Sequence, residues 1–295
     1  MDKDTRNSLR KTVEECRQLL EESVSGVLEG EFGVHSSGTV EPEEALGGLS
    51  EEDRECRERI LGSLNHIEAA GFDPDDAVEQ LIREVAFTHL NRLCAYKMME
   101  ARGLVREAVS SGLKSQGFMF YLADHPEDEQ RWSGGRQDVA YRHYLHWLAK
   151  TFSEQIPALF SPNDPANRLF PPQRVLDQVL ELINDEELAG IWDEDETIGW
   201  VYQYFTPKSQ RKKARDESSA PRNSYELAFR NQFYTPRYVV EFLTDNTLGR
   251  TWYEMREGRT ELTDQCTYLV HRPDEVLLSQ RDRKEAEEDP DAAFL

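Results

Sequence analysis

The sequence predicts a mainly α-helical protein, and two kinds of observation carry that prediction. Apolar residues recur at alternating steps of three and four along several stretches, which is the spacing of one helix face. Residues that favour helix ends flank these stretches, with Ser or Asp before them and Gly after. The 295 residues, 38% of them apolar, supply enough material for a core.

The first predicted element is an N-terminal helix within residues 1–28. Its seam suits either a short coiled coil or a helix lying on a core, and its limited length favours the core. Residues 29–50 are rich in Gly, Ser, Glu and Pro and predict a mobile linker. The residues that form the seam are Leu9, Val13, Cys16, Leu20, Val24 and Val27.

Residues 51–206 predict a helical scaffold domain. Its first helix follows Ser50 and has an acidic first turn. The best-marked helix has Asp73 as its cap, Pro74 at its first position and Gly103 at its end. Further helices are predicted over 137–153 and 172–184. The loop between these two is rich in proline, which blocks helix: Pro157, Pro162, Pro165, Pro171 and Pro172.

The charge of the chain limits the partners that its surface can bind. The 35 basic and 57 acidic residues give a formal net charge of −22. A surface this acidic cannot bind DNA all over, because neutralisation of phosphates drives most non-specific affinity. The sequence holds no apolar run of about 18 residues and no signal peptide. We therefore expect a cytoplasmic protein with no membrane partner.

One dense basic run is the candidate nucleic-acid site. It lies in residues 207–223, which we predict to be a linker, and it follows a group of aromatic residues at 200–205. Basic side chains beside aromatic rings suit a nucleic-acid strand, although a solvated linker beside a core cluster has the same pattern. The basic residues are Lys208, Arg211, Lys212, Lys213 and Arg215.

Histidines and cysteines give no metal site. His143 and His146 are spaced to share a metal, but no acidic or sulfur ligand is placed to complete the set. Cys16, Cys56 and Cys94 fall at apolar positions of predicted helices, so we interpret them as buried thiols. The sequence therefore predicts no metal ligands.

Residues 224–252 contain the most informative segment. Thr235 is predicted to be the cap of a helix and Pro236 its first residue, with Gly249 ending it in a left-handed conformation. The start of such a helix offers free N–H groups and the positive end of a dipole, which suit a carboxylate or a phosphate.

This segment resembles adenine-specific DNA methyltransferases. Phe233-Tyr234-Thr235-Pro236, followed by Val239-Val240, is similar to their motif X. The continuation over 245–252, the helix over 84–105 and the string at 198–205 resemble the large methyltransferases of BREX and phage-growth-limitation systems, which are akin to type IIG restriction-modification enzymes.

The resemblance implies an α/β Rossmann-like catalytic core that binds S-adenosylmethionine and methylates adenine N6 in double-stranded DNA. By the same resemblance Phe233, Tyr234, Thr235 and Pro236 are cofactor-binding residues. Tyr234 would pack on the cofactor, while Thr235 and the amides after Pro236 would receive its methionine carboxylate. Other defence-system subunits are implied as partners.

Two motifs of that family do not occur in the 295 residues. One is the glycine-rich cofactor loop of the type Asp-Pro-Ala-Cys-Gly-Ser-Gly, and the other is the catalytic Asn/Asp-Pro-Pro-Tyr. Residues 253–295 instead predict an acidic tail. We therefore expect no catalytic residue and no core in this chain, and no methyl transfer by the chain alone.

The alternative is a non-enzymatic acidic helical protein that binds a basic partner or mimics DNA. A DNA mimic would present acids along one face at the spacing of phosphates. The densest acids fall instead at 41–55, 185–196 and 282–291, in predicted loops and helix starts. That placement favours the methyltransferase interpretation.

Overall fold

The structure, a computed structural model, describes residues 1–221, 226–227, 230 and 234–272. Its regular elements in this part of the chain are helices. The described residues also contain one isolated antiparallel bridge, between Val34 and Val40. The prediction of a mainly α protein is therefore confirmed for the described residues. The chain divides into two compact units, residues 1–232 and residues 233–295.

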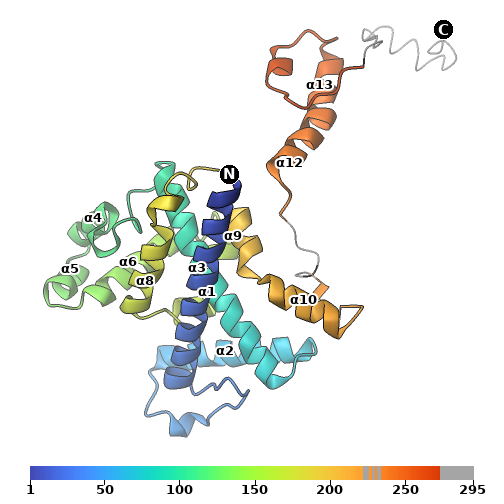
Figure 1. Ribbon diagram of the computed structural model, residues 1–295. Helices are drawn as coiled ribbons and strands as arrows, with labels where there is room; N and C mark the ends of the chain where they lie inside the picture. Colours follow the sequence, from blue (N-terminus) through green and yellow to red (C-terminus); the bar gives the residue numbers. More distant parts are fainter. Residues whose placement is uncertain (222–225, 228–229, 231–233, 273–295) are drawn as a thin grey trace. The chain divides into compact units, whose positions relative to one another are not determined.

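The first unit is a bundle of helices around α1 and α3 (Figure 1). Its α-helices are α1 (Lys3–Phe32), α2 (Glu51–Ala69), α3 (Pro74–Ala101), α4 (Gln116–Asp124), α5 (Pro126–Ser133), α6 (Gln137–Phe152), α7 (Pro157–Phe160), α8 (Gln173–Ile183), α9 (Thr197–Phe205) and α10 (Lys208–Glu217). Short 3₁₀ turns lie at η1 (Glu43–Ala45), η2 (Gly112–Lys114), η3 (Pro165–Asn167) and η4 (Glu186–Leu188).

The core of this unit forms where α1 packs on α3, α8 and α9, and where α2 packs on α3. Five of the six predicted seam residues of α1 are buried, as a helix on a core requires. Val27 is only half-buried, and Leu28 takes its place in the buried stripe because the stripe drifts around the helix. The buried seam consists of Leu9, Val13, Cys16, Leu20, Val24, Leu28 and Phe32. The predicted burial of Cys16, Cys56 and Cys94 is confirmed as well.

The segment predicted as a linker over 29–50 starts inside a helix. α1 continues to Phe32 and ends at Gly33, whose left-handed conformation (φ 62°) closes it. The chain after it is tied down by Arg57 of α2, which donates from Nε to the Phe32 carbonyl at 3.0 Å and also donates to the Glu41 carbonyl. The composition of this segment predicted a mobile linker. Composition cannot show that the buried guanidinium of Arg57, from another helix, binds two of its carbonyls.

The helices predicted in the scaffold are present with small shifts at their ends. α6 and α8 correspond to the predicted 137–153 and 172–184. The proline-rich loop between them was wrongly predicted to exclude helix, since Pro157 and Pro165 each open a short helical turn, where a proline is tolerated. α3 begins after Asp73, although the Asp73 side chain makes no capping bond, and Gly103 follows its end with φ 66°. α2 begins after Ser50 as predicted, and the Ser50 side chain caps it by accepting a hydrogen bond from the Asp53 N–H at 3.1 Å.

The second unit is a short helical segment. It contains α12 (Arg237–Thr244), a π-helical turn η5 (Asp245–Gly249), α13 (Arg250–Met255) and a 3₁₀ turn η6 (Glu261–Asp264). Across both units, none of the helices described here has the length and apolar character to cross a membrane.

Candidate cofactor segment and nucleic-acid interface

The predicted cofactor residues precede α12. Phe233 lies outside the described residues. Tyr234 and Pro236 are half-buried, and Thr235 is exposed. The predicted cap is wrong by one residue: Pro236 is the N-cap, and no side chain caps this helix. Pro236 fixes an extended conformation (φ −58°, ψ 144°) immediately before the helix, so Thr235 stands too far back to reach its N–H groups.

The predicted helix end at Gly249 is also wrong. Gly249 has a helical conformation (φ −60°, ψ −44°), and the helix runs through a π turn into α13. The left-handed residues come later, at Glu257 (φ 53°) and Gly258 (φ 76°). Gly249 is nevertheless needed for close packing, because a Cβ placed there would stand 3.3 Å from Cys266 Sγ.

Two side chains of the π turn hold the returning chain in place. Asp245 accepts a hydrogen bond from the Tyr268 N–H at 2.9 Å. Asn246 donates to the Tyr268 carbonyl at 2.7 Å and accepts from the Val270 N–H at 2.9 Å. Arg250 adds a bond from its guanidinium to the Val270 carbonyl at 3.2 Å. These side chains hold residues 268–270, more than twenty positions further along the chain, against the π turn.

The helix α12 exposes apolar side chains on more than one side. Its eight residues include none that is buried. Tyr238 is 60% exposed and Leu243 54%, and they lie five positions apart, which places them on different sides of the helix. Further exposed apolar residues of this unit are Val240, Phe242, Leu248, Trp252, Met255 and Val270. A helix that is apolar on several sides is typical of one that other protein surrounds.

The basic run predicted to contact nucleic acid is helical, and two of its arginines serve the fold. Arg211 is buried and donates to the Gln203 carbonyl at 2.9 Å. Arg215 donates to the Arg230 carbonyl at 3.1 Å. Lys212 is exposed. Lys208 and Lys213 lie in α10, but their side chains are outside the described part of the structure. Of the predicted five residues, the described side chains of Lys212 and Arg215 are exposed, and Arg215 is already engaged with a main-chain carbonyl.

The family-like helix over 84–105 uses its polar residues to anchor loops. Arg92 is buried, donates from Nε to the Leu159 carbonyl at 2.8 Å and from its guanidinium to Asn167 Oδ1 at 2.7 Å, and lies 3.6 Å from Asp164. Its burial lowers the pKa of Arg92, while the Asp164 carboxylate opposes this. Arg92 therefore holds the proline-rich loop, which is a structural role.

Lys97 and Glu100 of the same helix fix the chain that follows it. Lys97 donates from Nζ to Ser110 Oγ at 2.7 Å and to Asn184 Oδ1 at 2.5 Å. Glu100 accepts from the N–H groups of Ala108 and Val109. Burial lowers the pKa of Lys97. The residues that make this helix recognisable thus organise the scaffold around it.

The two histidines of α6 have separate surroundings. The His143 imidazole lies 2.7 Å from Asp128 Oδ1, an acidic neighbour that the sequence did not predict. Asp128 is buried, which raises its pKa, but hydrogen bonds from Tyr121, His143 and Arg131 outweigh this and lower it overall. His146 instead packs edge-on against Phe170 at 5.2 Å. In the described residues, no group of three metal-ligating side chains forms around either histidine.

Two buried imidazoles, His89 and His146, flank the ring of Phe170. His89 contacts that ring edge-on at 5.4 Å, and its Nε2 lies 2.8 Å from the Leu169 carbonyl. Burial is the main cause that lowers the pKa of His89 to about 3 and that of His146 to about 4. Both rings are therefore neutral near pH 7, as expected for core residues.

Sequence reasoning missed a basic contribution from α1. Arg6 and Arg10 lie beside the aromatic residues of α9, with the Arg6 guanidinium 5.3 Å from the Trp200 ring. The signal was two arginines one turn apart at the edge of an apolar seam, and it could not be assigned without knowing which helix packs there.

Comparison with known proteins gives two relatives and no matching family model. The adenine-specific methyltransferase BrxX of Escherichia coli O9:H4 (strain HS) is 26% identical over 213 residues, which cover 66% of this chain and 17% of BrxX. The adenine-specific methyltransferase PglX of Lacticaseibacillus casei (strain Zhang) is 26% identical over 212 residues, which cover 62% of this chain and 17% of PglX.

The chain thus spans about one sixth of the length of these curated relatives. Their names agree with the resemblance drawn from the residues at 84–105, 198–205 and 233–252. The chain is related to a part of the adenine-specific methyltransferases of the BrxX and PglX kind.

Proposed function

We propose that this chain is the N-terminal part of an S-adenosylmethionine-dependent adenine-N6 DNA methyltransferase of a phage-defence system. The similarity to BrxX and PglX carries the proposal. Residues 1–232 would provide a helical scaffold, and residues 233–252 would provide one side of a cofactor pocket. The double-stranded DNA substrate and any other defence subunits would be engaged by the complete enzyme.

The environment of α12 supports this assignment. Thr235 is exposed and does not cap the helix, so its hydroxyl is available to a ligand. The first N–H groups of a helix have no partner within the helix, and the dipole there favours an anion such as a carboxylate. Tyr234, half-buried next to Thr235, would supply an aromatic ring for packing. These groups fit one side of S-adenosylmethionine, which supplies the methyl group when it is bound.

The exposed apolar residues of the second unit support an incomplete site. A helix that presents Tyr238, Phe242 and Leu243 to solvent would be stabilised by burial against a catalytic core. The glycine-rich loop and the Asn/Asp-Pro-Pro-Tyr motif, which do not occur in these 295 residues, would belong to that core. The chain alone would bind S-adenosylmethionine weakly or not at all and would transfer no methyl group.

The contacts of the acidic residues favour the methyltransferase over a DNA mimic. Glu43 pairs with Arg54 at 2.8 Å, and Glu52 and Asp53 pair with Arg168 at 3.0 and 2.8 Å. Acids that are neutralised by nearby arginines form a poor imitation of an unpaired phosphate backbone.

Reading the gene beyond codon 295 in all three frames is the first test. We expect an Asp-Pro-x-x-Gly-x-Gly loop followed by Asn/Asp-Pro-Pro-Tyr. A stop codon with neither motif downstream in any frame would overturn the proposal. In a second test, the purified chain is incubated with tritiated S-adenosylmethionine and duplex DNA. Transfer of tritium to the DNA above background would contradict the proposal that this chain holds only one side of the cofactor pocket.

The role of Thr235 is tested in the polypeptide that carries both motifs. Thr235→Val should raise the KM for S-adenosylmethionine with a smaller effect on kcat, because it removes a cofactor contact. Thr244→Val, at the exposed other end of α12, is the matched control and should leave both constants unchanged.

A further inference from the structure

The side of α1 that faces α9 gathers cationic groups in a chain of net charge −22. Arg6, Arg10 and Arg17 project within a narrow sector of α1, because four residues advance a helix by slightly more than one turn. Arg6 and Arg10 are about 6 Å apart along the axis at 1.5 Å per residue. α9 packs beside α1 here, and Figure 1 shows the two helices next to each other. We name Arg6, Arg10 and Tyr204 the α1–α9 seam, which is distinct from the buried apolar seam of α1 described above.

The aromatic residues of α9 position this seam. The Arg6 guanidinium lies 5.3 Å from the centre of the Trp200 ring, and Trp200 stacks on Tyr204 with ring centres 5.6 Å apart. Trp200 is buried, so its ring serves as a fixed support for Arg6. Arg17, further along α1, donates to the Phe205 carbonyl at 2.9 Å and fixes the end of α9 against α1.

Tyr204 of α9 lies within electrostatic reach of both arginines. Partial burial is the main cause that raises the pKa of Tyr204, and the charges of Arg6 and Arg10 act in the opposite direction. Arg6, Arg10 and Tyr204 are each half-buried, so a ligand can reach them from solvent. Guanidinium groups and a hydroxyl donor on neighbouring helices are groups that can contact phosphates of a DNA backbone.

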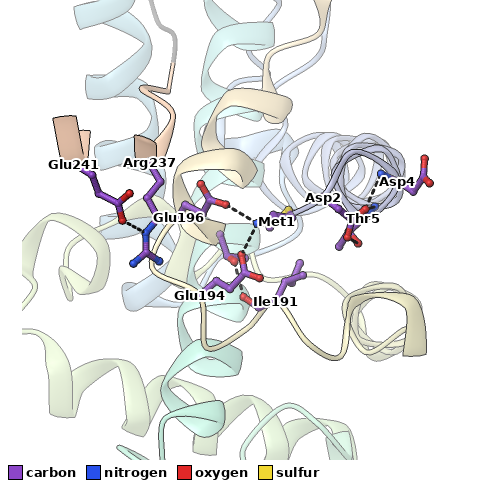
Figure 2. A network of polar contacts seen from close by, with 10 residues as sticks. Met1, Asp2, Asp4, Thr5, Ile191, Glu194, Glu196, Arg237 and Glu241 are labelled. Atoms are coloured by element: carbon purple, nitrogen blue, oxygen red, sulfur yellow. Dashed lines mark hydrogen bonds and ion pairs between the residues drawn. The ribbon is translucent and has the colours of Figure 1, made fainter. Parts of the chain in front are cut away.

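Acidic residues mark the limits of the seam. Glu194 and Glu196 lie at one end, but both contact the Met1 ammonium, at 3.3 and 3.0 Å, as Figure 2 shows. Glu14 is one turn beyond Arg10, and Glu21 is 3.8 Å from Arg17. The cationic stretch is therefore short, about the length of two phosphate contacts.

We infer that the α1–α9 seam binds the sugar-phosphate backbone of duplex DNA. This inference rests on the proposed function, because DNA is the substrate that the proposal assigns. It moves the backbone contact away from the predicted run in α10, where Arg211 and Arg215 bind main-chain carbonyls. Contacts of this kind position a protein on the duplex without reading its sequence.

The test measures anisotropy of a fluorescein-labelled 24-base-pair duplex with the full 295-residue chain, from 25 to 200 mM KCl and without S-adenosylmethionine. Arg6→Gln/Arg10→Gln should weaken binding about tenfold and reduce the slope of log K against log salt by about 1.8, at about 0.9 for each lost phosphate contact. Arg54→Gln/Arg59→Gln removes the same charge from the exposed side of α2 and should change neither quantity.

Two further variants keep the inference testable if the double variant at the seam fails to fold. Tyr204→Phe keeps the ring stacked on Trp200 and should weaken binding through loss of the hydroxyl alone. Glu14→Gln should strengthen binding, because it removes the negative charge next to Arg10. Circular dichroism melting of each variant checks the fold.

Equal weakening by the α1 and α2 double variants would overturn the inference, since overall charge would then explain the binding. Absence of binding by the wild-type chain at 25 mM KCl would overturn it as well. If Lys212→Gln alone weakened DNA binding, the backbone contact would lie in α10 and the inference would fail. None of these outcomes bears on the cofactor test, so the proposed function can stand or fail separately.

Discussion

The two units of this chain treat apolar side chains in opposite ways. In residues 1–232, α1 buries a continuous apolar stripe from Leu9 to Phe32, and Leu20 in that stripe has no exposed surface. In residues 233–295, Leu248 is 74% exposed and α12 buries none of its residues. Both units are helical and have residues of similar type. The difference teaches that the first unit contains its own core, while the described residues of the second leave apolar side chains exposed, as the proposed contact with a catalytic core would require.

The largest test of this comparison uses the same substitution in each unit. Leu20→Ala should lower the free energy of unfolding by about 2–5 kcal/mol, because it removes buried methyl groups and leaves a cavity. Leu248→Ala should change it by less than about 0.5 kcal/mol, as exposed positions do. Urea unfolding followed by circular dichroism measures both. A loss at Leu248 comparable to that at Leu20 would mean that the second unit is packed within this chain.

A pH titration sharpens the picture of the first unit, whose core includes neutral imidazoles. His89 has a pKa of about 3 when folded, well below its value in an unfolded chain. The contribution of His89 to the free energy of unfolding is therefore fully present above the unfolded pKa of about 6.5. It is lost as the pH falls from that value toward 3. Unfolding free energies measured from pH 7.5 to 4 should fall along this window.

His89→Gln keeps a donor for the Leu169 carbonyl without a group that titrates, so it should flatten the decline below pH 6.5. His66→Gln, on the exposed side of α2, is the control and should leave the pH dependence unchanged. An identical profile for wild type and His89→Gln would show that other groups cause the decline.

The smallest expected effect compares the starts of two helices. Ser50→Ala removes an observed cap of α2 and should cost about 1 kcal/mol. Thr235→Ala removes the residue that precedes α12 without capping it, so the unfolding free energy should be unchanged. Thermal melting of both variants measures the contrast. A clear loss with Thr235→Ala would restore the predicted cap.

Local patterns predicted much of the fold. The three- and four-residue spacing located α1, α6 and α8, and Ser50 and Gly103 marked helix ends because these roles depend on neighbours in sequence. The spacing of apolar residues also anticipated which side of α1 is buried.

Long-range contacts explain what the sequence did not predict. A basic run gives no sign that Arg211 and Arg215 will bind carbonyls of the chain around it. The helix continues past Gly249, and Asp245 and Asn246 beside it bind residues 268–270, contacts that no local pattern reveals. The cofactor residues themselves were indicated by resemblance, and Thr235 keeps that assignment as a proposal.

The contacts of Asp245 and Asn246 have a consequence for the way this chain responds to cutting. Their side chains connect the π turn to residues 268–270, whereas the left-handed turn at Glu257 and Gly258 lies between the two attachment points. A protease that cleaves this turn would produce two fragments that remain associated through these bonds. Such a nick would be visible on a denaturing gel while the native particle kept its size.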